Sequence, residues 1–491
     1  MRRAFGPDAA LVGLTLGGTL VACGLGMLAC AGIGIEQGRA ATAFVLPGAG
    51  TVALGAGLLR ISTAARHHGF VVRPVTGLMA VTLAWVGASL AGAVPLLAAG
   101  TFDSPLDAVF EATSGFTTTG STLLGEIETE PDAVLLWRSI MQWLGGVGIV
   151  VLVVAIAPVS GPGVQRAFYA ETSGITAERL TPRIIDTAKI IAAIYLALSA
   201  AAAIAYLIAG MGIFDAINHS MTTIATGGYS TRTESIAGFD SLPIELVAIA
   251  FMALSAVNFA FYWRAVRGRS LMPQAAEVAA FVAILVAAIA AVTVSLEFAD
   301  DAGGAAASLR QSAFSATSIM TTTGYTTADF DAWNSFARVV ILVLMTAGAC
   351  AGSTAGGIKV IRLVLLGKSA RQELDRQLQP RAVRVLRLGG HTYSEDVRRA
   401  VLGFFLVYVL VYVTGSLVMA ASGLDLVTAI SSVASTLNII GPGLGEVGAT
   451  ENFEAVPPFG RVVLPILMIA GRLEVFTVVA LLAALFRLRR R

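Results

Sequence analysis

Residues 318–327 read SIMTTTGYTT, a polar run with one glycine that lies between two strongly apolar segments. Three similar runs occur elsewhere: FTTTGST contains Gly120, TIATGGYS contains Gly227, and LNIIGPGLG contains Gly441. Together with Gly324, these glycines recur at roughly 100-residue intervals, which indicates an internal repeat. The sequence therefore predicts four copies of one structural unit.

The composition is that of a membrane protein. Of the 491 residues, 56% are hydrophobic and only 13% are charged, whereas a soluble globular domain carries about 25% charged residues. Apolar segments long enough to cross a bilayer, each needing roughly 20 residues, recur along the chain. They lie near 10–34, 41–59, 76–99, 134–158, 186–210, 242–264, 274–298, 338–366, 396–420 and 460–486. The first is too long for a cleaved signal peptide and is expected to be a transmembrane helix.

Four shorter, semi-apolar stretches lie between pairs of these spans, and each ends in one of the glycine runs. They are 105–119, 214–226, 308–323 and 425–440. Such lengths indicate re-entrant helices that dip into the bilayer and return. We therefore expect an all-α polytopic membrane protein. Two extra helices in 1–75 precede four units of helix, re-entrant pore loop and helix, at 76–165, 166–272, 273–395 and 396–491.

The charges along the chain predict its orientation. Arginines and lysines gather on one side of the spans, between 2 and 3, 60 and 73, 166 and 183, 264 and 269, 359 and 399, and 487 and 491. Acidic loops, GEIETEPD and TADFD, lie on the other side. The basic side is expected to be cytoplasmic, with both termini there. Each unit then has two spans and the same orientation, so the four units can surround a pseudo-fourfold axis.

The glycine runs have a chemical use at membrane depth. Non-helical backbone is tolerated there only where protein covers it or where it lines a watery cavity. Four loops on one axis form a ring of carbonyl oxygens, which can replace the hydration shell of a monovalent cation. Each re-entrant helix also points the negative end of its dipole at the axis. A single run of this kind is better explained as a capped turn between helices, but its fourfold repetition favours the ring.

Several motifs together resemble a known family. EATSGFTTTGST, FDAINHSMTTIATGGYS, SATSIMTTTGYTT, LNIIGPGLGEVG, GACAGSTAGGIKVIR and GRLEVFT are similar to those of the Trk/Ktr superfamily of potassium transporters, in particular the bacterial Trk type with two additional N-terminal helices. The resemblance implies a pore-forming homodimer that takes up potassium across the bacterial cytoplasmic membrane. It also implies gating by a cytosolic ring of RCK-like subunits that bind a nucleotide, ATP/ADP or NAD. We expect no cofactor in this chain, contacts with membrane lipids, and no nucleic-acid partner.

The resemblance also assigns the selectivity filter, which would bind potassium through backbone carbonyls. Its candidate residues are Thr118, Thr119 and Gly120; Ala225, Thr226 and Gly227; Thr322, Thr323 and Gly324; and Ile439, Ile440 and Gly441. The fourth run departs from the threonine pattern. Because Ile439 and Ile440 offer only carbonyls, the ring is expected to be chemically asymmetric and its selectivity weaker.

A glycine-rich motif, GACAGSTAGGIK at 348–359, interrupts the apolar segment 338–366. Glycine costs about 1 kcal/mol of helix stability relative to alanine, so the helix is expected to break or bend here. The resemblance implies a gating loop beneath the filter that blocks the pore until it is displaced. Close packing of helices through small residues spaced four apart is the alternative. The gating candidates are Gly348, Gly352, Ser353, Thr354, Gly356, Gly357, Lys359 and Arg472.

Four ionisable residues within or beside the membrane segments are candidates for a functional or a structural role. Arg472 lies mid-span, where a charge costs at least about 2.5 kcal/mol; it can hold the gating loop, form a positive barrier, or pair with a buried acid. Lys359 can snorkel to the cytoplasmic interface or take part in gating. Glu111 and His219, on the first and second re-entrant helices, are expected to brace the loops.

Other functions fit parts of the sequence. A proton- or sodium-coupled symporter needs a titratable coupling site, for which only Glu111 is available. An intramembrane hydrolase would use Ser114 with His219, but it leaves the fourfold repeat unexplained. A non-conducting receptor or scaffold could dock a partner on the basic segment 366–399, which also suits anionic lipids. With four histidines in the chain, a metal site of another kind is not expected.

Overall fold

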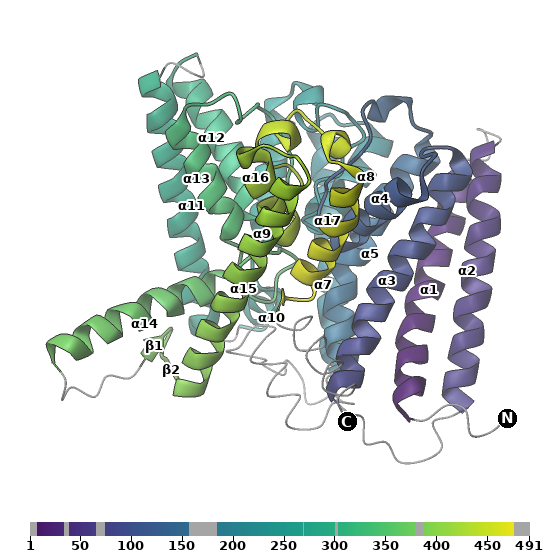
Figure 1. Cartoon of the computed structure of the whole chain (residues 1–491), viewed down its shortest axis with the longest axis horizontal. Helices are drawn as coiled ribbons and strands as arrows, with labels where there is room; N and C mark the ends of the chain where they lie inside the picture. The colour runs from purple at the N-terminus through teal and green to yellow at the C-terminus, as the bar shows by residue number, and fades with distance from the viewer. Residues whose placement is uncertain are drawn as a thin grey trace.

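The computed structural model describes residues 7–33, 39–64, 74–156, 184–268, 270–299, 303–379 and 386–475. Long helices stand side by side, and short helices lie among them in the upper half of the molecule (Figure 1). Apart from one small hairpin and short 3-10 turns in the loops, the described elements are α-helices. The predicted all-α polytopic class is confirmed.

The two N-terminal helices pack closely against each other. They are α1 (Pro7–Ile33) and α2 (Arg39–Ala64). A β-carbon placed on Gly17 would lie 2.8 Å from the Gly55 carbonyl oxygen, and one on Gly48 would lie 3.1 Å from that of Gly24. Small residues of this kind allow membrane helices to approach backbone to backbone.

The remaining helices follow the predicted order four times: a long helix, a short helix that ends in a glycine loop, and a second helix. The elements are α3 (Pro74–Ala99), α4 (Pro105–Thr117) and α5 (Asp132–Ile156); α7 (Ile184–Ile208), α8 (Ile213–Ile224), α9 (Leu242–Ser255) and α10 (Phe259–Val266); α11 (Met272–Ala299), α12 (Ala305–Met320), α13 (Ser335–Thr346) and α14 (Val360–Leu378); and α15 (Glu395–Ala421), α16 (Leu426–Leu437) and α17 (Pro458–Arg472). We call these groups units one to four. The exact unit boundaries stay predictions, and the one at 165 lies outside the described residues.

Two predicted spans are broken. The segment predicted at 242–264 consists of α9 and α10, which meet at 88°. Asn258 causes the break, because its side-chain oxygen accepts a hydrogen bond from Ala260 N (2.8 Å) and so starts a new helix. The segment predicted at 338–366 ends as a helix at Thr346 and resumes at Val360. The last span, predicted at 460–486, is described only as far as residue 475.

The described part of the basic segment 366–399, predicted as a surface for a partner or anionic lipids, contains regular structure. α14 projects sideways from the base of the bundle, and the antiparallel strands β1 (Leu386–Leu388) and β2 (His391–Tyr393) follow it (Figure 1). Lys368 Nζ donates to the Arg387 carbonyl at 2.6 Å and so ties α14 to the hairpin. The described residues of this segment therefore form a helix joined to a hairpin.

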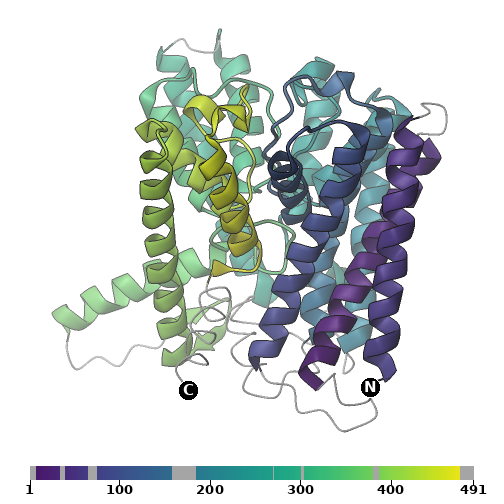
Figure 2. The same ribbon diagram turned by 45° about the vertical axis from the view of Figure 1, so that its right-hand side comes forward.

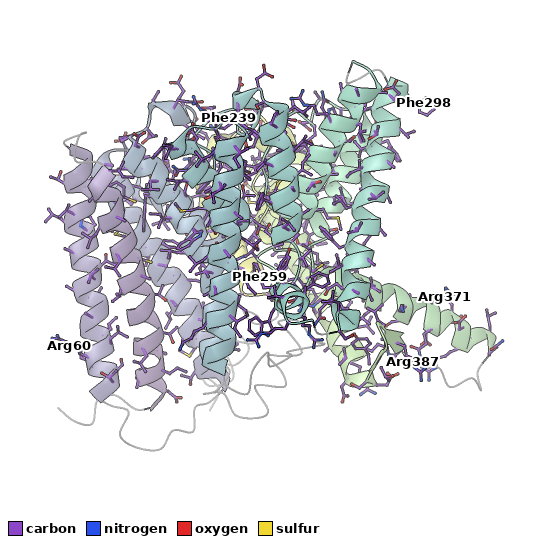
Figure 3. All side chains as sticks on the ribbon, turned by 180° about the vertical axis from the view of Figure 1, so that it is seen from behind. Arg60, Phe239, Phe259, Phe298, Arg371 and Arg387 are labelled. Carbon is purple, nitrogen blue, oxygen red and sulfur yellow. The ribbon has the colours of Figure 1, made fainter. Side chains whose placement is uncertain are left out.

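The outer surface of the bundle suits lipid. Six described helices, α1, α2, α3, α7, α11 and α15, are long and apolar enough to cross a membrane, and α9 with α10 makes a seventh if the bent pair is one span. Apolar side chains project outward, including Phe298, which is 90% exposed. Arg60, Arg371 and Arg387 lie at the opposite end of the molecule from Phe239 and Phe298 (Figure 3).

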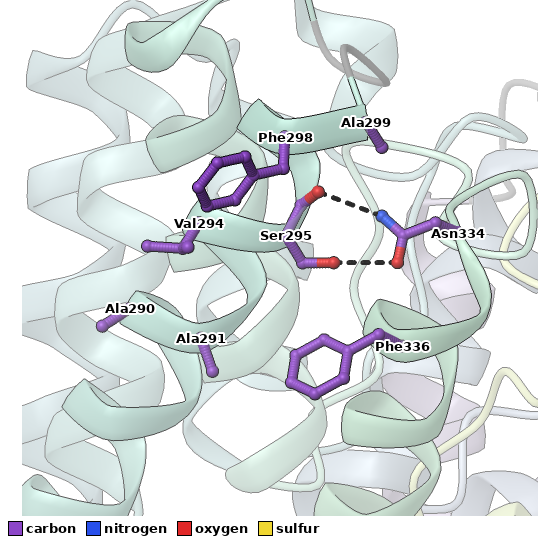
Figure 4. Close-up of a pocket in the computed structure, with 8 residues that line it drawn as sticks. All are labelled: Ala290, Ala291, Val294, Ser295, Phe298, Ala299, Asn334 and Phe336. Carbon is purple, nitrogen blue, oxygen red and sulfur yellow. Dashed lines mark hydrogen bonds between the residues drawn. The ribbon is translucent and has the colours of Figure 1, made fainter.

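A shallow pocket lies on this outer surface between α11 and α13 (Figure 4). Its lining is mostly apolar, and its two polar residues satisfy each other, because Ser295 Oγ donates to Asn334 Oδ1 at 2.8 Å. None of the residues that line this pocket belongs to a glycine loop, so the pocket lies apart from those loops.

Candidate functional site

The four glycine loops share one backbone conformation. In each loop, the residue after the helix end or its cap is left-handed, and so is the glycine two positions later. The first set is Thr118, Thr226, Thr322 and Ile439, with φ of 60°, 53°, 57° and 53°; the second is Gly120, Gly228, Gly324 and Gly441, with φ of 84°, 78°, 82° and 110°. Glycine reaches such angles without steric cost, so the repeated runs have a repeated conformational reason.

The loops meet in a closed ring. A β-carbon on Gly120 would collide with the carbonyl oxygen of Gly227 in the next loop, and one on Gly324 would collide with that of Ile440. Gly228 stands in the same relation to Thr323, and a β-carbon on Gly441 would lie 3.0 Å from the Thr119 carbonyl oxygen. Each glycine therefore abuts the next unit in the order one, two, three, four, one.

Contacts between units four and one close this ring outside the loops. Arg461 of α17 binds Asp107 of α4 at 2.9 Å, and Phe110 packs against Phe453 with ring centroids 5.8 Å apart. Figure 2 shows α17 in yellow beside the dark blue α4. The arrangement has the predicted pseudo-fourfold order.

The predicted alignment of the second loop is wrong by one residue. Thr226 N bonds to the Thr223 carbonyl and Gly227 N to that of Thr222, just as Thr322 N and Thr323 N bond back to α12. The conformation therefore matches Thr226, Gly227 and Gly228 to the other loops, in place of Ala225, Thr226 and Gly227. Ala225 is instead the right-handed C-cap of α8. The adjacent Gly227 and Gly228 explain the error, because either one can be matched to the single glycine of the other runs.

Glu111 braces the first loop, as predicted. It is fully buried, and its carboxylate accepts hydrogen bonds from Arg138 Nε (2.9 Å), Leu123 N (3.0 Å) and Thr122 Oγ1 (3.0 Å). Arg138, from α5, also lies over the Tyr229 ring at 4.0 Å. Removing one partner of a buried ion pair typically costs about 3–5 kcal/mol, so this pair fixes the loop's outer arm.

Tyrosines that follow the loop glycines connect neighbouring units. Tyr229, after Gly228, donates to the Glu111 carbonyl of unit one at 3.0 Å. Tyr325, after Gly324, makes a 2.6 Å hydrogen bond with Thr222 Oγ1 of unit two. Each tyrosine thus ties its own loop to the short helix of the preceding unit.

His219 braces the second loop, again as predicted. Its ring nitrogens lie 2.8 Å from the Asp215 carbonyl oxygen and 3.0 Å from Ser230 Oγ. These hydrogen bonds hold the second loop in place. His219 makes no hydrogen bond to Ser114, the residue that the hydrolase alternative would pair with it. Gln142 of α5 supports the same loop, since its Nε2 donates to the Gly227 carbonyl at 2.6 Å and its Oε1 accepts from Tyr229 N at 3.1 Å.

The outer loops of units one and two are joined at Glu128. Its carboxylate accepts hydrogen bonds from Thr233 Oγ1 and from Thr233 N (2.9 Å). Burial alone would raise the pKa of Glu128, but the Thr233 hydrogen bonds outweigh it and hold the pKa below its ordinary value. The contact therefore stabilises the fold above the ordinary pKa and weakens as the pH falls through the lowered one.

Residues 347–359 form an irregular loop against the starts of the glycine loops. Gly356 N donates to Thr322 Oγ1 at 2.8 Å, and Thr354 Oγ1 donates to the Ile224 carbonyl at 3.0 Å. A β-carbon on Gly356 would collide with the Ile439 side chain. The 347–359 loop thus contacts units two, three and four at once.

The break in this segment confirms the expected effect of its glycines. Gly352 and Gly357 have φ of 76° and 65°, and Gly348 N donates to the Ile358 carbonyl at 2.6 Å to close the loop on itself. Ser353 Oγ donates to the Cys350 carbonyl at 2.6 Å. The alternative of helix packing through small residues is wrong, because the segment is not helical.

Arg472 holds the 347–359 loop. It is 3% exposed, and its guanidinium donates to the Thr354 carbonyl (2.8 Å) and the Gly145 carbonyl (2.8 Å). Among the residues that the structure describes, no acidic side chain pairs with Arg472, so the predicted ion pair with a buried acid is not found there. Glu474 instead pairs with Arg362.

Lys359 does not snorkel to the interface. Its side chain is 8% exposed, and Nζ donates to the Ala355 carbonyl at 2.5 Å. It therefore stabilises the 347–359 loop from within.

Sequence reasoning missed Arg138, Gln142, the two bracing tyrosines, and Glu277, whose carboxylate accepts a hydrogen bond from Ala351 N of the 347–359 loop. A signal was present for two of them. Arg138 and Glu277 are charged residues inside the predicted spans 134–158 and 274–298, and a charge within a membrane span usually marks a functional or bracing contact.

A bundle of membrane helices built around a ring of four glycine loops defines a polytopic transport protein for cations. Comparison with known proteins agrees: residues 42–487 match the TrkH family, described as cation transport proteins, and the chain belongs to that family. Its role is transport rather than catalysis.

Individual relatives cover most of the chain. The Trk system potassium uptake protein TrkH of Halomonas elongata is 40% identical over 428 residues, which is 86% of this chain and 88% of that protein. TrkH of Escherichia coli is 39% identical over 417 residues, covering 84% of this chain and 85% of that one. The crystal structure of the potassium transporter TrkH from Vibrio parahaemolyticus superposes with a TM-score of 0.86, at 37% identity over 96% of this chain and 98% of that chain.

Proposed function

We propose that this chain is the pore-forming subunit of a potassium-uptake system, conducting potassium through the ring of glycine loops. The observation that carries the proposal is the closed ring of four loops with matching left-handed positions. The names of its relatives, potassium uptake proteins of Trk systems, support potassium as the transported ion. Potassium is then a substrate, and the chain needs no cofactor of its own.

The potassium-binding oxygens are assigned to backbone carbonyls of the four loops. With the corrected second loop, the residues are Thr118, Thr119 and Gly120; Thr226, Gly227 and Gly228; Thr322, Thr323 and Gly324; and Ile439, Ile440 and Gly441. Such carbonyls replace the water lost by an entering ion, and the C-terminal ends of the short helices add negative potential. Two of these carbonyls also accept hydrogen bonds from side chains: that of Gly227 from Gln142 Nε2 at 2.6 Å, and that of Gly441 from Ser435 Oγ at 2.5 Å.

The 347–359 loop is the gate in this proposal. It bonds to Thr322 and Ile224 and presses on Ile439, so it lies where ions leaving the loops must pass. Arg472 secures it through Thr354. Opening then requires these contacts to break.

A channel-like mechanism is favoured over proton or sodium coupling. A symporter needs a titratable group facing the ion, and Glu111 was the available candidate. Its carboxylate is instead occupied by Arg138 and Leu123 behind the loop. We therefore propose that the membrane potential and the potassium gradient drive uptake.

The wider assembly is also part of the proposal. Homodimers of this chain would lie in the bacterial cytoplasmic membrane, contacting lipids, with the basic end and both termini in the cytoplasm. A Trk-type regulatory ring that binds ATP/ADP or NAD would dock at that end. The membership of relatives in named Trk systems supports such a partner.

Flux into liposomes tests the function. Purified protein should pass potassium or rubidium down a gradient with no proton or sodium gradient, and Gly324→Ser should reduce the flux and the preference over sodium, because a side chain there collides with the Ile440 carbonyl. Uptake that requires a proton or sodium gradient would establish the symporter instead. Unchanged flux and selectivity in Gly324→Ser would overturn the assignment of the ring as the filter.

A further inference from the structure

A buried carboxylate lies at the foot of the 347–359 loop. Glu277, on α11, is 5% exposed. Burying an acid is costly unless its oxygens are hydrogen-bonded, so its partners reveal what it stabilises.

The partners of Glu277 are backbone groups from both sides of the loop. Oε1 accepts a hydrogen bond from Ala351 N at 2.7 Å and another from Ile361 N at 3.4 Å. Ala351 lies in the loop, whereas Ile361 belongs to the first turn of α14. One oxygen atom therefore joins the gate candidate to the helix that follows it.

The bond to Ile361 also serves as a helix cap supplied from another element. Lys359, at the N-cap of α14, makes no side-chain cap, and the first N–H groups of a helix need an outside acceptor. A carboxylate there also matches the positive end of the helix dipole. Glu277 thus stabilises the start of α14.

The glycine-rich composition of the loop makes such an anchor necessary. Gly348, Gly352, Gly356 and Gly357 have no side chains with which to fix the backbone. The nearby Lys359 and Arg362 are bonded elsewhere, to the Ala355 carbonyl and to Glu474. A side-chain oxygen that accepts from backbone N–H groups is therefore well suited to fix this loop.

We propose that Glu277 is the latch that keeps the 347–359 loop against the glycine loops and couples it to α14, so that loop and helix move together. The inference rests on the proposed gating role of the loop. Glu277 acts through the loop and contacts no ion, so it is a positioning residue. Its loss should favour the displaced loop without changing the ring.

The experiment uses the full chain in liposomes without any regulatory partner, in a Cys23→Ala, Cys30→Ala background. Cys350 is then the one cysteine of the chain, and in the closed loop it is fully buried. The two main quantities measured for Glu277→Gln and Glu277→Ala are rubidium flux and labelling of Cys350 by a water-soluble maleimide. The rubidium-to-sodium flux ratio and the melting temperature are measured as checks. Glu297→Gln, on the same helix near its other end, is the matched control.

Both quantities should rise in the order wild type, Gln, Ala. Hydrogen bonds to a charged acceptor contribute enough that losing them should change the closed-to-open ratio by about tenfold in Glu277→Ala. Gln keeps an acceptor oxygen but loses the charge, so its effect should be smaller. The rubidium-to-sodium ratio and the control variant should match wild type. A purely structural role would lower flux and the melting temperature together.

The two readouts separate this proposal from the proposed gate. If labelling rises while flux stays constant, the latch stands and the loop is not the gate. If neither changes although Gly356→Ala raises flux, the gate stands and the latch is overturned. Should Glu277→Ala fail to fold, Glu277→Gln decides: wild-type labelling and flux would overturn the latch.

Discussion

Single residues in the glycine loops adopt backbone angles that most side chains resist. Ile439 is β-branched and has a φ of 53°, a conformation that is an outlier for such residues and indicates that the surrounding structure enforces it. Glycine at the third position of each loop is required twice over, by its angle and by the carbonyl of the next unit. The loops therefore tolerate change very unevenly.

The corrected second loop gives a prediction that separates two adjacent glycines. Gly228→Ala should disturb flux and selectivity strongly, because the residue has a φ of 78° and a β-carbon would meet the Thr323 carbonyl; the left-handed angle alone costs about 1–2 kcal/mol. In Gly227→Ala, the atoms nearest the β-carbon belong to the Gln142 side chain, whose amide would have to move and would weaken its hydrogen bonds to the loop, a smaller cost than displacing backbone. Melting temperatures and rubidium-to-sodium flux ratios should rank Gly228→Ala below Gly227→Ala.

Gly57→Ala is the control, since a β-carbon on Gly57 has no neighbour within 4 Å. The reverse ranking of the two loop variants would instead support Ala225, Thr226 and Gly227 as the residues that match the other loops.

The positions of most loop glycines could be predicted from the sequence, whereas the contacts between the loops could not. Gly120, Gly324 and Gly441 were placed correctly from the repeated runs. The second loop was misaligned because Gly227 and Gly228 are adjacent, although the shared Gly-Tyr pair, at Tyr229 and Tyr325, contains the correct alignment. The packing of each glycine on the next unit was not predictable, because no local pattern specifies it.

Elements were predictable where hydrophobic length determines them. The short helices begin and end within three residues of the stretches predicted from composition, as α4 (Pro105–Thr117) does for 105–119. The break between α9 and α10 was missed, because it depends on a cap at Asn258 inside an otherwise apolar segment. Contacts of the 347–359 loop such as that of Thr354 with Ile224 are tertiary, and the sequence pattern alone could not specify them.

At the scale of elements, the packing of the 347–359 loop against the fourth glycine loop requires Gly356, which has no side chain. Gly356→Ala should prevent the loop from seating, because its β-carbon would collide with Ile439 and with the Asn438 carbonyl. Partner-free rubidium flux in liposomes should therefore rise, by tenfold for each 1.4 kcal/mol lost from the closed state. Gly367→Ala on α14 is the control, since a β-carbon there has no neighbour within 4 Å. Flux at or below the control would argue against this loop as a gate.

At the scale of the whole molecule, the gate candidate is connected to one end of the bundle. α14 starts at the loop, is held there by Glu277, and is tied to the hairpin through Lys368 and Arg387. A partner that moves the hairpin can therefore move the loop without entering the membrane.

This connection predicts how a charge reversal at that end behaves. The double variant Arg371→Glu, Arg387→Glu should keep partner-free flux, because both side chains are exposed and distant from the ring (Figure 3). Its response to the regulatory subunit should weaken and become less sensitive to salt, since exposed charges attract partners through a screened field. Flux titrated with the subunit at two ionic strengths measures this.

Arg60→Glu is the control, because Arg60 lies at the same end of the molecule but on α2 (Figure 3). An equal loss of response in the control would show that general charge, rather than the α14 region, governs docking.

The tyrosine contacts also distinguish two seams of the ring from the other two. Tyr229 and Tyr325 cross two of its four seams, whereas the matching positions hold Pro442, which has no side-chain donor, and Ser121, whose short side chain reaches only the Gly441 carbonyl at 3.1 Å. The other two seams depend on different contacts: Ser121 and the Arg461–Asp107 ion pair between units four and one, and Gly445 N with Asp331 between units three and four. Loss of either tyrosine hydroxyl is therefore expected to loosen one seam and leave the contacts of these two in place.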